Sequence, residues 1–198
     1  MRRGATGFVV MSVLSMVAAM ELRAQSGPVL DGLVGYWPFE GEVLLDASGN
    51  GHDLLPANAT PQCAEGFAPG VMGVSRWVLP CGGLIAEDPA VFDQLSTLSV
   101  SLWINPAQSQ QQTYSAVVYR ANRKVDSPSV GWSDRALAIF WTPGGLHFTY
   151  TTEGAGWQTE CVNHHLGLEA DTWHHVAATI DGPTQTAKLY ANGACDET

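Results

Sequence analysis

The most constraining stretch of this sequence is Thr172–Gly193, TWHHVAATIDGPTQTAKLYANG. Apolar and polar side chains alternate along its first half, which is the pattern of a strand that is buried on one face. Asp181–Pro183 then predicts a turn, because glycine adopts positive φ and proline cannot continue a central strand. A second alternating run follows, and Asn192–Gly193 opens a tight turn of the hairpin type. The stretch therefore predicts an antiparallel meander.

The rest of the chain has the composition of many short strands joined by turns. Its 198 residues leave room for one sandwich-sized domain with a core. It is 45% hydrophobic and only 14% charged, with 21 Gly and 11 Pro, which excludes a disordered chain or a coiled coil. Alternation predicts further strands at Leu33–Phe39, Gly73–Pro80, Gly83–Ala86, Leu95–Pro106, Tyr114–Arg120, Arg135–Trp141, Gly145–Thr152 and Trp157–Val162.

Three motifs in order resemble the laminin-G-like, concanavalin A-like jelly-roll domains of secreted proteins. They are Leu33–Asp53 with its D-x-S-G-N-G loop, Leu98–Pro106 ending in W-x-x-P, and the W-H-H-V-A and L-Y-x-N-G pair of the meander. The resemblance implies an all-β fold, an antiparallel β-sandwich of two curved sheets, over residues 33–198. Residues 25–32 are expected to be a linker. Domains of this family bind glycans or proteins, sometimes with calcium.

Domains of that family normally continue after L-Y-x-N-G and close with a strand that packs beside the first one. Here Thr198 follows the motif by a few residues. We expect either a C-terminally incomplete domain of a longer protein, which is the interpretation we favour, or a sandwich with an open edge.

The first 24 residues have the pattern of a secretory signal peptide. Two arginines form a basic start, Phe8–Met20 is an apolar run too short to span a membrane comfortably, and Ala24 precedes the expected cleavage point. Arg23 is unusual in a cleavage region, so cleavage near Ala18–Ala19 and an uncleaved anchor stay open as alternatives. We expect residues 1–24 to lie outside the mature fold.

The charge balance excludes several classes of partner. The net charge is −10, and loss of residues 1–24 removes three arginines and one glutamate, a net +2, which leaves −12. Nucleic acid and anionic membrane surfaces repel such a chain. We therefore expect a secreted protein, extracellular or periplasmic, that neither binds nucleic acid nor inserts into a membrane after signal cleavage.

The expected mature chain contains four cysteines: Cys63, Cys81, Cys161 and Cys195. An even number behind a signal peptide favours disulfides, and four cysteines allow three connectivities. We favour Cys63–Cys81, which closes a Gly- and Pro-rich loop, and Cys161–Cys195, which ties a strand to the end of the meander. Zinc is the alternative, but no C-x-x-C pair is present.

The loop Asp46–Asp53, DASGNGHD, is the candidate metal site. Its glycines let the backbone turn sharply, so that carbonyls and the Asp46 carboxylate can point inward, and Asn50 adds an amide oxygen. Calcium takes about six to eight such oxygens. The resemblance also implies calcium, to which this loop often contributes in the family. The alternative is an Asx-type turn in which Asp46 caps backbone amides without an ion.

The aromatic and histidine residues are sorted by position. Sugar rings have apolar faces that stack on aromatic rings, so tryptophans near loops or strand ends are candidate ligand-binding residues: Trp132, Trp141 and Trp157. Ordinary rim packing is the alternative. Three tryptophans in family-like strand positions are expected to be structural: Trp37, Trp103 and Trp173.

His174 and His175 point to opposite faces of a strand, so they cannot chelate one ion together, and one is expected to be buried and hydrogen-bonded.

Some sandwiches of this class are glycoside hydrolases with two carboxylates facing each other across the substrate. Their acids come from E-x-D-x-E or E-x-D-x-x-E on a strand, whereas Glu169-x-Asp171-x-x-His174 lacks the last acid. The sequence therefore predicts a non-catalytic module that recognises carbohydrate or another extracellular ligand, with Ca²⁺ as candidate cofactor. The alternatives are a protein–protein adhesion module and an incomplete or degenerate glycoside hydrolase.

Overall fold

The computed structural model describes residues 9–12, 32–40, 43–56, 65–78, 82–86, 96–107, 115–121, 135–142, 145–151, 159–164 and 168–196. In these ranges the regular structure consists of antiparallel strands, so the all-β prediction is confirmed. The described residues contain no helix long and apolar enough to cross a membrane. The chain divides into two compact units, one formed by residues 1–9 and 96–198 and the other by residues 10–95.

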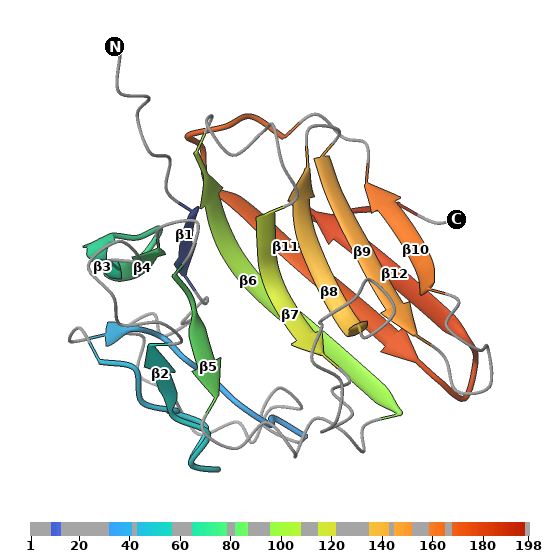
Figure 1. Ribbon diagram of the computed structural model, residues 1–198, viewed down its shortest axis with the longest axis horizontal. Coiled ribbons are helices and arrows are strands. Elements are labelled where there is room, and N and C mark those ends of the chain that lie inside the picture. The colour runs from blue at the N-terminus through green and yellow to red at the C-terminus, as the bar shows by residue number, and fades with distance from the viewer. Residues whose placement is uncertain are drawn as a thin grey trace, which may run out of the picture. The chain divides into compact units, whose positions relative to one another are not determined.

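One sheet of the first unit contains the predicted meander (Figure 1). Its strands are β6 (Thr97–Pro106), β11 (His174–Asp181), β12 (Thr186–Ala191) and β13 (Ala194–Asp196), in the order β13-β12-β11-β6. Each strand is antiparallel to its neighbour, and the register places Trp103 opposite His175 and Ala177 opposite Tyr190. Asn192 and Gly193 have φ values of 51° and 81°, as the predicted tight turn requires.

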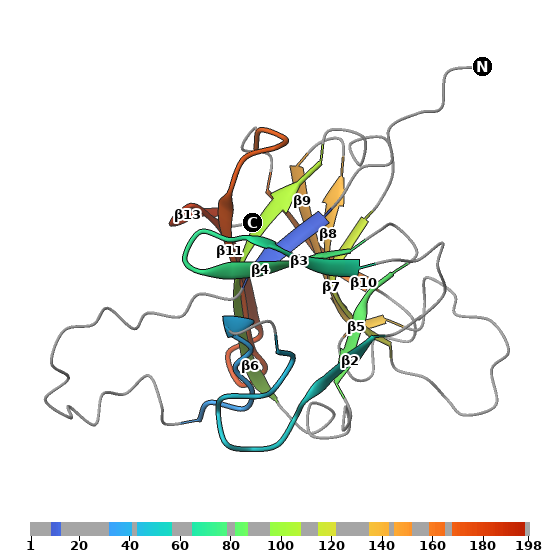
Figure 2. The same cartoon turned by 90° about the vertical axis from the view of Figure 1, so that its left-hand side faces the viewer.

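The second sheet of this unit has the order β10-β9-β8-β7 (Figure 1). Its strands are β7 (Ser115–Ala121), β8 (Arg135–Thr142), β9 (Gly145–Thr151) and β10 (Thr159–His164). All three pairings are antiparallel, with a bulge in β7 between Ala116 and Val118. The two sheets form two layers (Figure 2), and β10 lies beside β12 and β13.

The core of the unit lies between these layers. In the first sheet, alternate residues such as Leu102, Val176 and Leu189 are buried, while their chain neighbours point outward. In the second sheet, Ile139 and Phe148 face each other across β8 and β9 and are fully buried. Each large apolar side chain removed from water in this way contributes about 1.5–3 kcal/mol to the free energy of folding. The period-two pattern of the sequence is thus explained by a sandwich.

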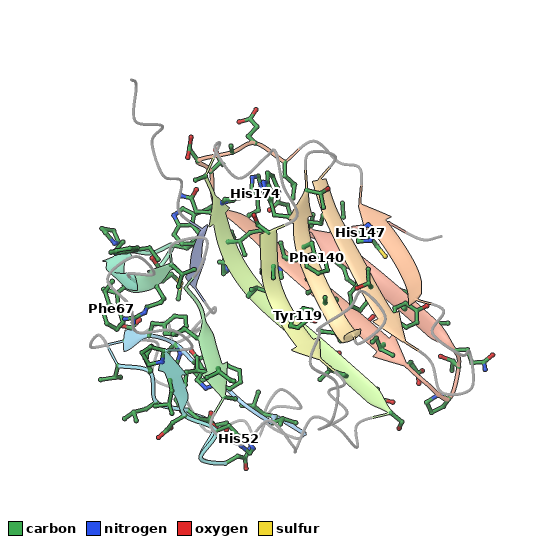
Figure 3. All side chains as sticks on the ribbon, viewed as in Figure 1. His52, Phe67, Tyr119, Phe140, His147 and His174 are labelled. Atoms are coloured by element: carbon green, nitrogen blue, oxygen red, sulfur yellow. The ribbon has the colours of Figure 1, made fainter. Side chains whose placement is uncertain are left out.

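The second unit contains two strand pairs. β3 (Glu65–Pro69) and β4 (Val74–Val78) form a hairpin, in which the Arg76 guanidinium lies 4.5 Å from the centre of the Phe67 ring (Figure 3). β2 (Leu54–Pro56) pairs with β5 (Leu84–Ala86). The sequence pattern predicted β4 and β5 but assigned residues 66–73 to a loop, whereas the first half of this stretch belongs to β3.

The predicted strand at Leu33–Phe39 is wrong. This segment makes no strand ladder, because its backbone groups bond to the Asp46–Asp53 loop instead. Pro38 has no N–H to donate, and Phe39 has a φ of 59°, which a regular strand does not allow. The apolar side chains on both faces of this segment indicated that it is buried, but they could not show whether it pairs with another strand.

Part of the predicted signal peptide is a strand in the structure. β1 (Val9–Ser12) lies within residues 1–24, which the sequence pattern placed outside the fold. Val9 and Val10 are β-branched, and an apolar run of this kind pairs readily in a sheet while it stays attached to the chain. Cleavage of residues 1–24, and with it secretion, stays a prediction.

Candidate functional site

The Asp46 carboxylate lies at the centre of a hydrogen-bonded loop. Its Oδ1 accepts hydrogen bonds from the Tyr36 and Ser48 backbone N–H groups, at 2.9 and 2.8 Å. Its Oδ2 accepts from the Ser48 hydroxyl at 2.7 Å and from the His52 N–H at 3.0 Å. A carboxylate has about four lone-pair positions, so these four donors fill its acceptor capacity.

These donors also determine the ionisation of Asp46. Partial burial raises the pKa of the carboxyl group, but the hydrogen bonds from Tyr36, Ser48 and His52 outweigh it and lower the pKa to about 2. Asp46 is therefore ionised at neutral pH without a metal ion beside it.

Asn50 also binds the adjacent segment of the same chain. Its Nδ2 donates to the carbonyl oxygens of Leu33 and Val34, at 2.8 and 3.0 Å, and the Ser48 hydroxyl accepts from its backbone N–H at 3.2 Å. Asp53 accepts from the Asp46 N–H at 2.8 Å. The loop thus ties residues 33–36 to residues 46–53 by polar contacts.

This arrangement does not fit a calcium site centred on Asp46. An ion would have to displace N–H or O–H donors from the carboxylate, and calcium needs several more oxygens besides. Across the part of the chain that the structure describes, no group of three or more His, Cys, Asp or Glu residues is placed to hold a metal ion. Of the two interpretations of the loop, the contacts favour the Asx-type turn over a calcium site at Asp46 and Asn50, and calcium as a cofactor stays an untested prediction.

The prediction of an exposed tryptophan platform is wrong for Trp141. This side chain is 1% exposed, because it shares the inner face of β8 with Ile139 and lies opposite Leu146 on β9. Its Nε1 has no hydrogen-bond partner among the described residues. Trp132 and Trp157 lie outside the described residues, so their role as ligand-binding residues stays a prediction.

The strand order nevertheless relates the segments that carry Trp132 and Trp157. β7 ends at Ala121 opposite Arg135, where β8 begins, and β9 ends at Thr151 opposite Thr159, where β10 begins. Since β8 and β9 are antiparallel neighbours, both ends lie at the same end of the four-stranded sheet (Figure 1). The two connections therefore start and finish next to each other.

An exposed tyrosine lies at this end of the sheet. Tyr119 is 41% exposed on the outward face of β7, and its ring packs edge-on against Phe140 with centroids 6.5 Å apart. His147 lies opposite Phe140 on β9 (Figure 3), and Thr149 lies opposite Ala138 in the row that contains Tyr119. We call this side of the sheet, with Tyr119, Phe140, His147 and Thr149, the Tyr119 face; of the four, Tyr119 is exposed, His147 is half-buried, and Phe140 and Thr149 are buried.

The Tyr119 face contains an unpaired hydroxyl. Thr149 Oγ1 is buried and has no hydrogen-bond partner among the described residues. An unpaired buried polar group costs about 1–3 kcal/mol. The sequence predicted a strand at Tyr114–Arg120, but it could not show the bulge at Val117, which shifts which residues of β7 face outward, so Tyr119 was not among the predicted site residues.

The histidine pair behaves as predicted. His174 is buried: its Nε2 donates to the Glu169 carbonyl at 2.7 Å, and its Nδ1 accepts from Asn192 Nδ2 at 3.1 Å. These partners place the ring proton on Nε2. His175 points to the opposite, outward face.

The predicted Cys161–Cys195 bridge is not formed in the structure, where Cys195 is an exposed free thiol. Its strand, β13, lies beside β10, which carries Cys161, so the pairing stays a prediction. Cys63 and Cys81 lie outside the described residues.

The two-layer antiparallel fold defines a β-sandwich domain. A family model described as the concanavalin A-like lectin/glucanases superfamily matches residues 82–198. The chain therefore belongs to the laminin-G-like domains of this superfamily, as its motifs predicted. The superfamily includes both enzymes and binding modules.

One solved structure shares the fold. It is domain 4 of AbnA, an extracellular GH43 arabinanase from Geobacillus stearothermophilus, in complex with arabinotriose. The match covers 82% of this chain and 72% of that chain, with 17% sequence identity and a TM-score of 0.57. No curated protein sequence matches this chain.

Proposed function

We propose that this domain is a secreted, non-catalytic module that binds a neutral carbohydrate at the Tyr119 end of the four-stranded sheet. The observation that carries the proposal is the strand order. It brings exposed Tyr119 to the end where the segments bearing Trp132 and Trp157 both attach. Up to three aromatic side chains are then available from one end of one sheet.

The chemistry of this end suits a sugar ring. Aromatic rings stack on the apolar face of a sugar, and polar groups beside them bond to its hydroxyls. The chain has a net charge of −10, which disfavours acidic polysaccharides. The related domain was solved with arabinotriose, so a short neutral oligosaccharide is the first ligand to try.

The test is calorimetric titration of the protein with arabinotriose, xylotriose, cellotriose and maltotriose. We expect Tyr119→Ala, Trp132→Ala and Trp157→Ala each to weaken binding by roughly tenfold, since each removes one stacking ring. Met72→Ala removes a side chain that is also exposed, but in the other unit, and serves as the matched control. Unchanged affinity in all three aromatic variants, with the fold retained, would refute the proposal.

Hydrolysis is tested on the same material. A reducing-sugar assay with the matching polysaccharides is expected to show no release. Release that persists in a highly purified preparation would instead support a glycoside hydrolase.

A second candidate, protein–protein adhesion, is favoured by a different surface. Among the described residues of the second unit, six large apolar side chains are exposed, and the four most exposed are Val43 at 43%, Leu45 at 58%, Leu55 at 46% and Ile85 at 52%. Leu55 and Ile85 lie directly opposite each other on β2 and β5. Exposed apolar clusters mark contact sites. If adhesion through this surface is the function, Leu55→Lys with Ile85→Lys should abolish self-association in analytical ultracentrifugation and leave sugar binding unchanged.

A further inference from the structure

The sheet opposite the Tyr119 face also presents aromatic and polar side chains on its outward side. Trp103 on β6 lies opposite His175 on β11, and Ser101 lies in one row with Ala177 and Tyr190. These side chains point away from the core, since the residues that alternate with them, such as Leu102 and Val176, are buried. We call the set Ser101, Trp103, His175 and Tyr190 the Trp103 face.

The groups of the Trp103 face are held in place by one another. The Trp103 and His175 rings lie 5.3 Å apart with their planes tilted by 59°. Ser101 Oγ is 2.9 Å from His175 Nε2, and the His175 backbone N–H donates to Asn192 Oδ1 at 3.0 Å. A ligand would therefore meet side chains that are already ordered, which lowers the entropic cost of binding.

One polar group of this face has no partner. The Trp103 indole Nε1 is buried, and among the described residues nothing accepts its hydrogen bond. A buried indole N–H usually finds an acceptor. Trp103 is still partly exposed, so part of its ring is available for contact with a ligand.

The Trp103 face is suited to a neutral ligand. Burial lowers the pKa of His175, so its imidazole is uncharged at neutral pH and acts as a hydrogen-bonding group. Ser101 and Ala177 are small and lie between the larger rings of Trp103 and Tyr190. Two aromatic rings, a hydroxyl and an uncharged imidazole match the apolar faces and hydroxyls of a sugar.

We infer that the Trp103 face is a second carbohydrate-binding surface, which takes a neutral sugar chain on the side of the sandwich opposite the Tyr119 face. The inference depends on its own residues, and it holds whether or not the Tyr119 face binds.

Two outward faces on opposite sheets have a consequence for function. A short oligosaccharide cannot reach both faces, but a single domain can hold two separate polysaccharide chains at once. Where those two chains are held in one polysaccharide matrix, binding at the second face becomes intramolecular, and the overall avidity exceeds the affinity of either face.

The test is an NMR titration of the full chain with arabinotriose, xylotriose, cellotriose and maltotriose. We expect shifts of the Trp103 indole N–H and of the Ser101, His175 and Tyr190 amide signals. Trp103→Ala should weaken binding at this face by roughly tenfold. Because that variant removes a half-buried ring, Ser101→Ala and Tyr190→Phe are measured beside it, with smaller but clear losses expected.

The outcomes separate the two surfaces. Shifts at both faces, with two sugars bound per chain and one in Tyr119→Ala, support the second site. Shifts confined to the Tyr119 face, with Ser101→Ala and Tyr190→Phe inert, overturn this inference and leave the proposed function standing. Shifts confined to the Trp103 face support this inference and refute the proposed function. If no signal shifts at either face, both are refuted.

Discussion

The carboxylate of Asp46 joins two chain segments, because it accepts from Tyr36 on one side and from Ser48 and His52 on the other. It thereby gives residues 33–36 a fixed position without a strand ladder. Since the hydrogen bonds favour the ionised form, the stability that Asp46 supplies depends on pH.

We predict that acid removes this contribution. The folded pKa is lowered from the model-compound value of 3.8 to about 2, so the contribution is complete above pH 4 and disappears as pH falls through about 2. With allowance for solvent screening it amounts to about 1–2 kcal/mol. Urea unfolding of Asp46→Asn and the unaltered protein should differ by this amount at pH 7 and converge towards pH 2.

The control for this prediction is Asp171→Asn. Asp171 is exposed and has a φ of 57°, which asparagine also adopts readily. A pH-independent difference for Asp46→Asn, or an equal effect of Asp171→Asn, would show that the carboxylate does not act in this way.

We also predict that calcium does not stabilise the protein through Asp46. The melting temperature with millimolar calcium should equal that with chelator, because four donors already occupy the carboxylate. A bound ion would stabilise the folded state by mass action. A rise in melting temperature that Asp46→Ala abolishes would establish the calcium site instead.

Single residues show where reasoning from sequence stops. The motif DASGNGHD indicated that Asp46 turns its carboxylate inward, which is correct, but it could not tell an ion from four N–H and O–H donors. Trp141 was judged by its place near a strand end, whereas its exposure depends on which side of β8 faces the other sheet. That orientation is set by tertiary packing.

At the scale of elements, the β12–β13 turn links both histidines. Asn192 donates to His174 Nδ1 and accepts from the His175 N–H, while its own φ of 51° forms the turn. One side chain therefore connects the turn to the first residues of β11.

We predict that Asn192→Gly lowers the free energy of unfolding by about 1–2 kcal/mol. Glycine accepts the positive φ, so the loss reports the two side-chain hydrogen bonds and not backbone strain. Urea denaturation measures it. Gln185→Gly is the matched control, since Gln185 also has positive φ, at 54°, in the exposed β11–β12 turn. If both variants lose the same free energy of unfolding, the loss comes from the greater conformational entropy of glycine in the unfolded chain and not from the side-chain hydrogen bonds.

The second prediction for elements concerns β10 and β13. These strands lie beside each other although they belong to different sheets, so Cys161 and Cys195 can meet at one edge of the sandwich. Protein secreted under oxidising conditions and digested without reduction should yield a Cys161–Cys195 peptide in mass spectrometry. Cys195→Ser should then cost about 2–4 kcal/mol. A free Cys195 thiol in the secreted protein would rule the bridge out.

Elements with a one-sided alternating pattern were predicted best. Leu95–Pro106 corresponds to β6, and the meander gives β11 and β12 with the expected turn at Asn192–Gly193. The pattern failed where both faces are apolar, as in Leu33–Phe39, and where glycine and proline are frequent, as in β3. In these stretches the partner strand, or its absence, decides the structure, and a local pattern has no information about it.

At the scale of the whole molecule, the strand order could not be read from the sequence. β11 pairs with β6 although all four strands of the second sheet lie between them in the chain. The alternating pattern identifies which face of each strand is buried but not its neighbour. The sandwich architecture was predicted from the resemblance to a known family. The two candidate binding faces could be located only from the strand register of the structure.

The last prediction concerns the independence of the first unit. Residues 96–198 contain β6, β11, β12 and β13 of the seven-stranded sheet, the whole four-stranded sheet and the apolar layer between them. The Gly182 N–H bonds to the Ser96 carbonyl at the start of this range. A domain that contains its own core is expected to fold alone. The fragment Ser96–Thr198 should therefore unfold cooperatively in urea, and Leu189→Lys, which places a charge in the core, should abolish the transition. A fragment that shows no cooperative transition, while the full chain does, would mean that residues outside this range complete the sandwich and that the two proposed carbohydrate-binding faces exist only in the longer chain.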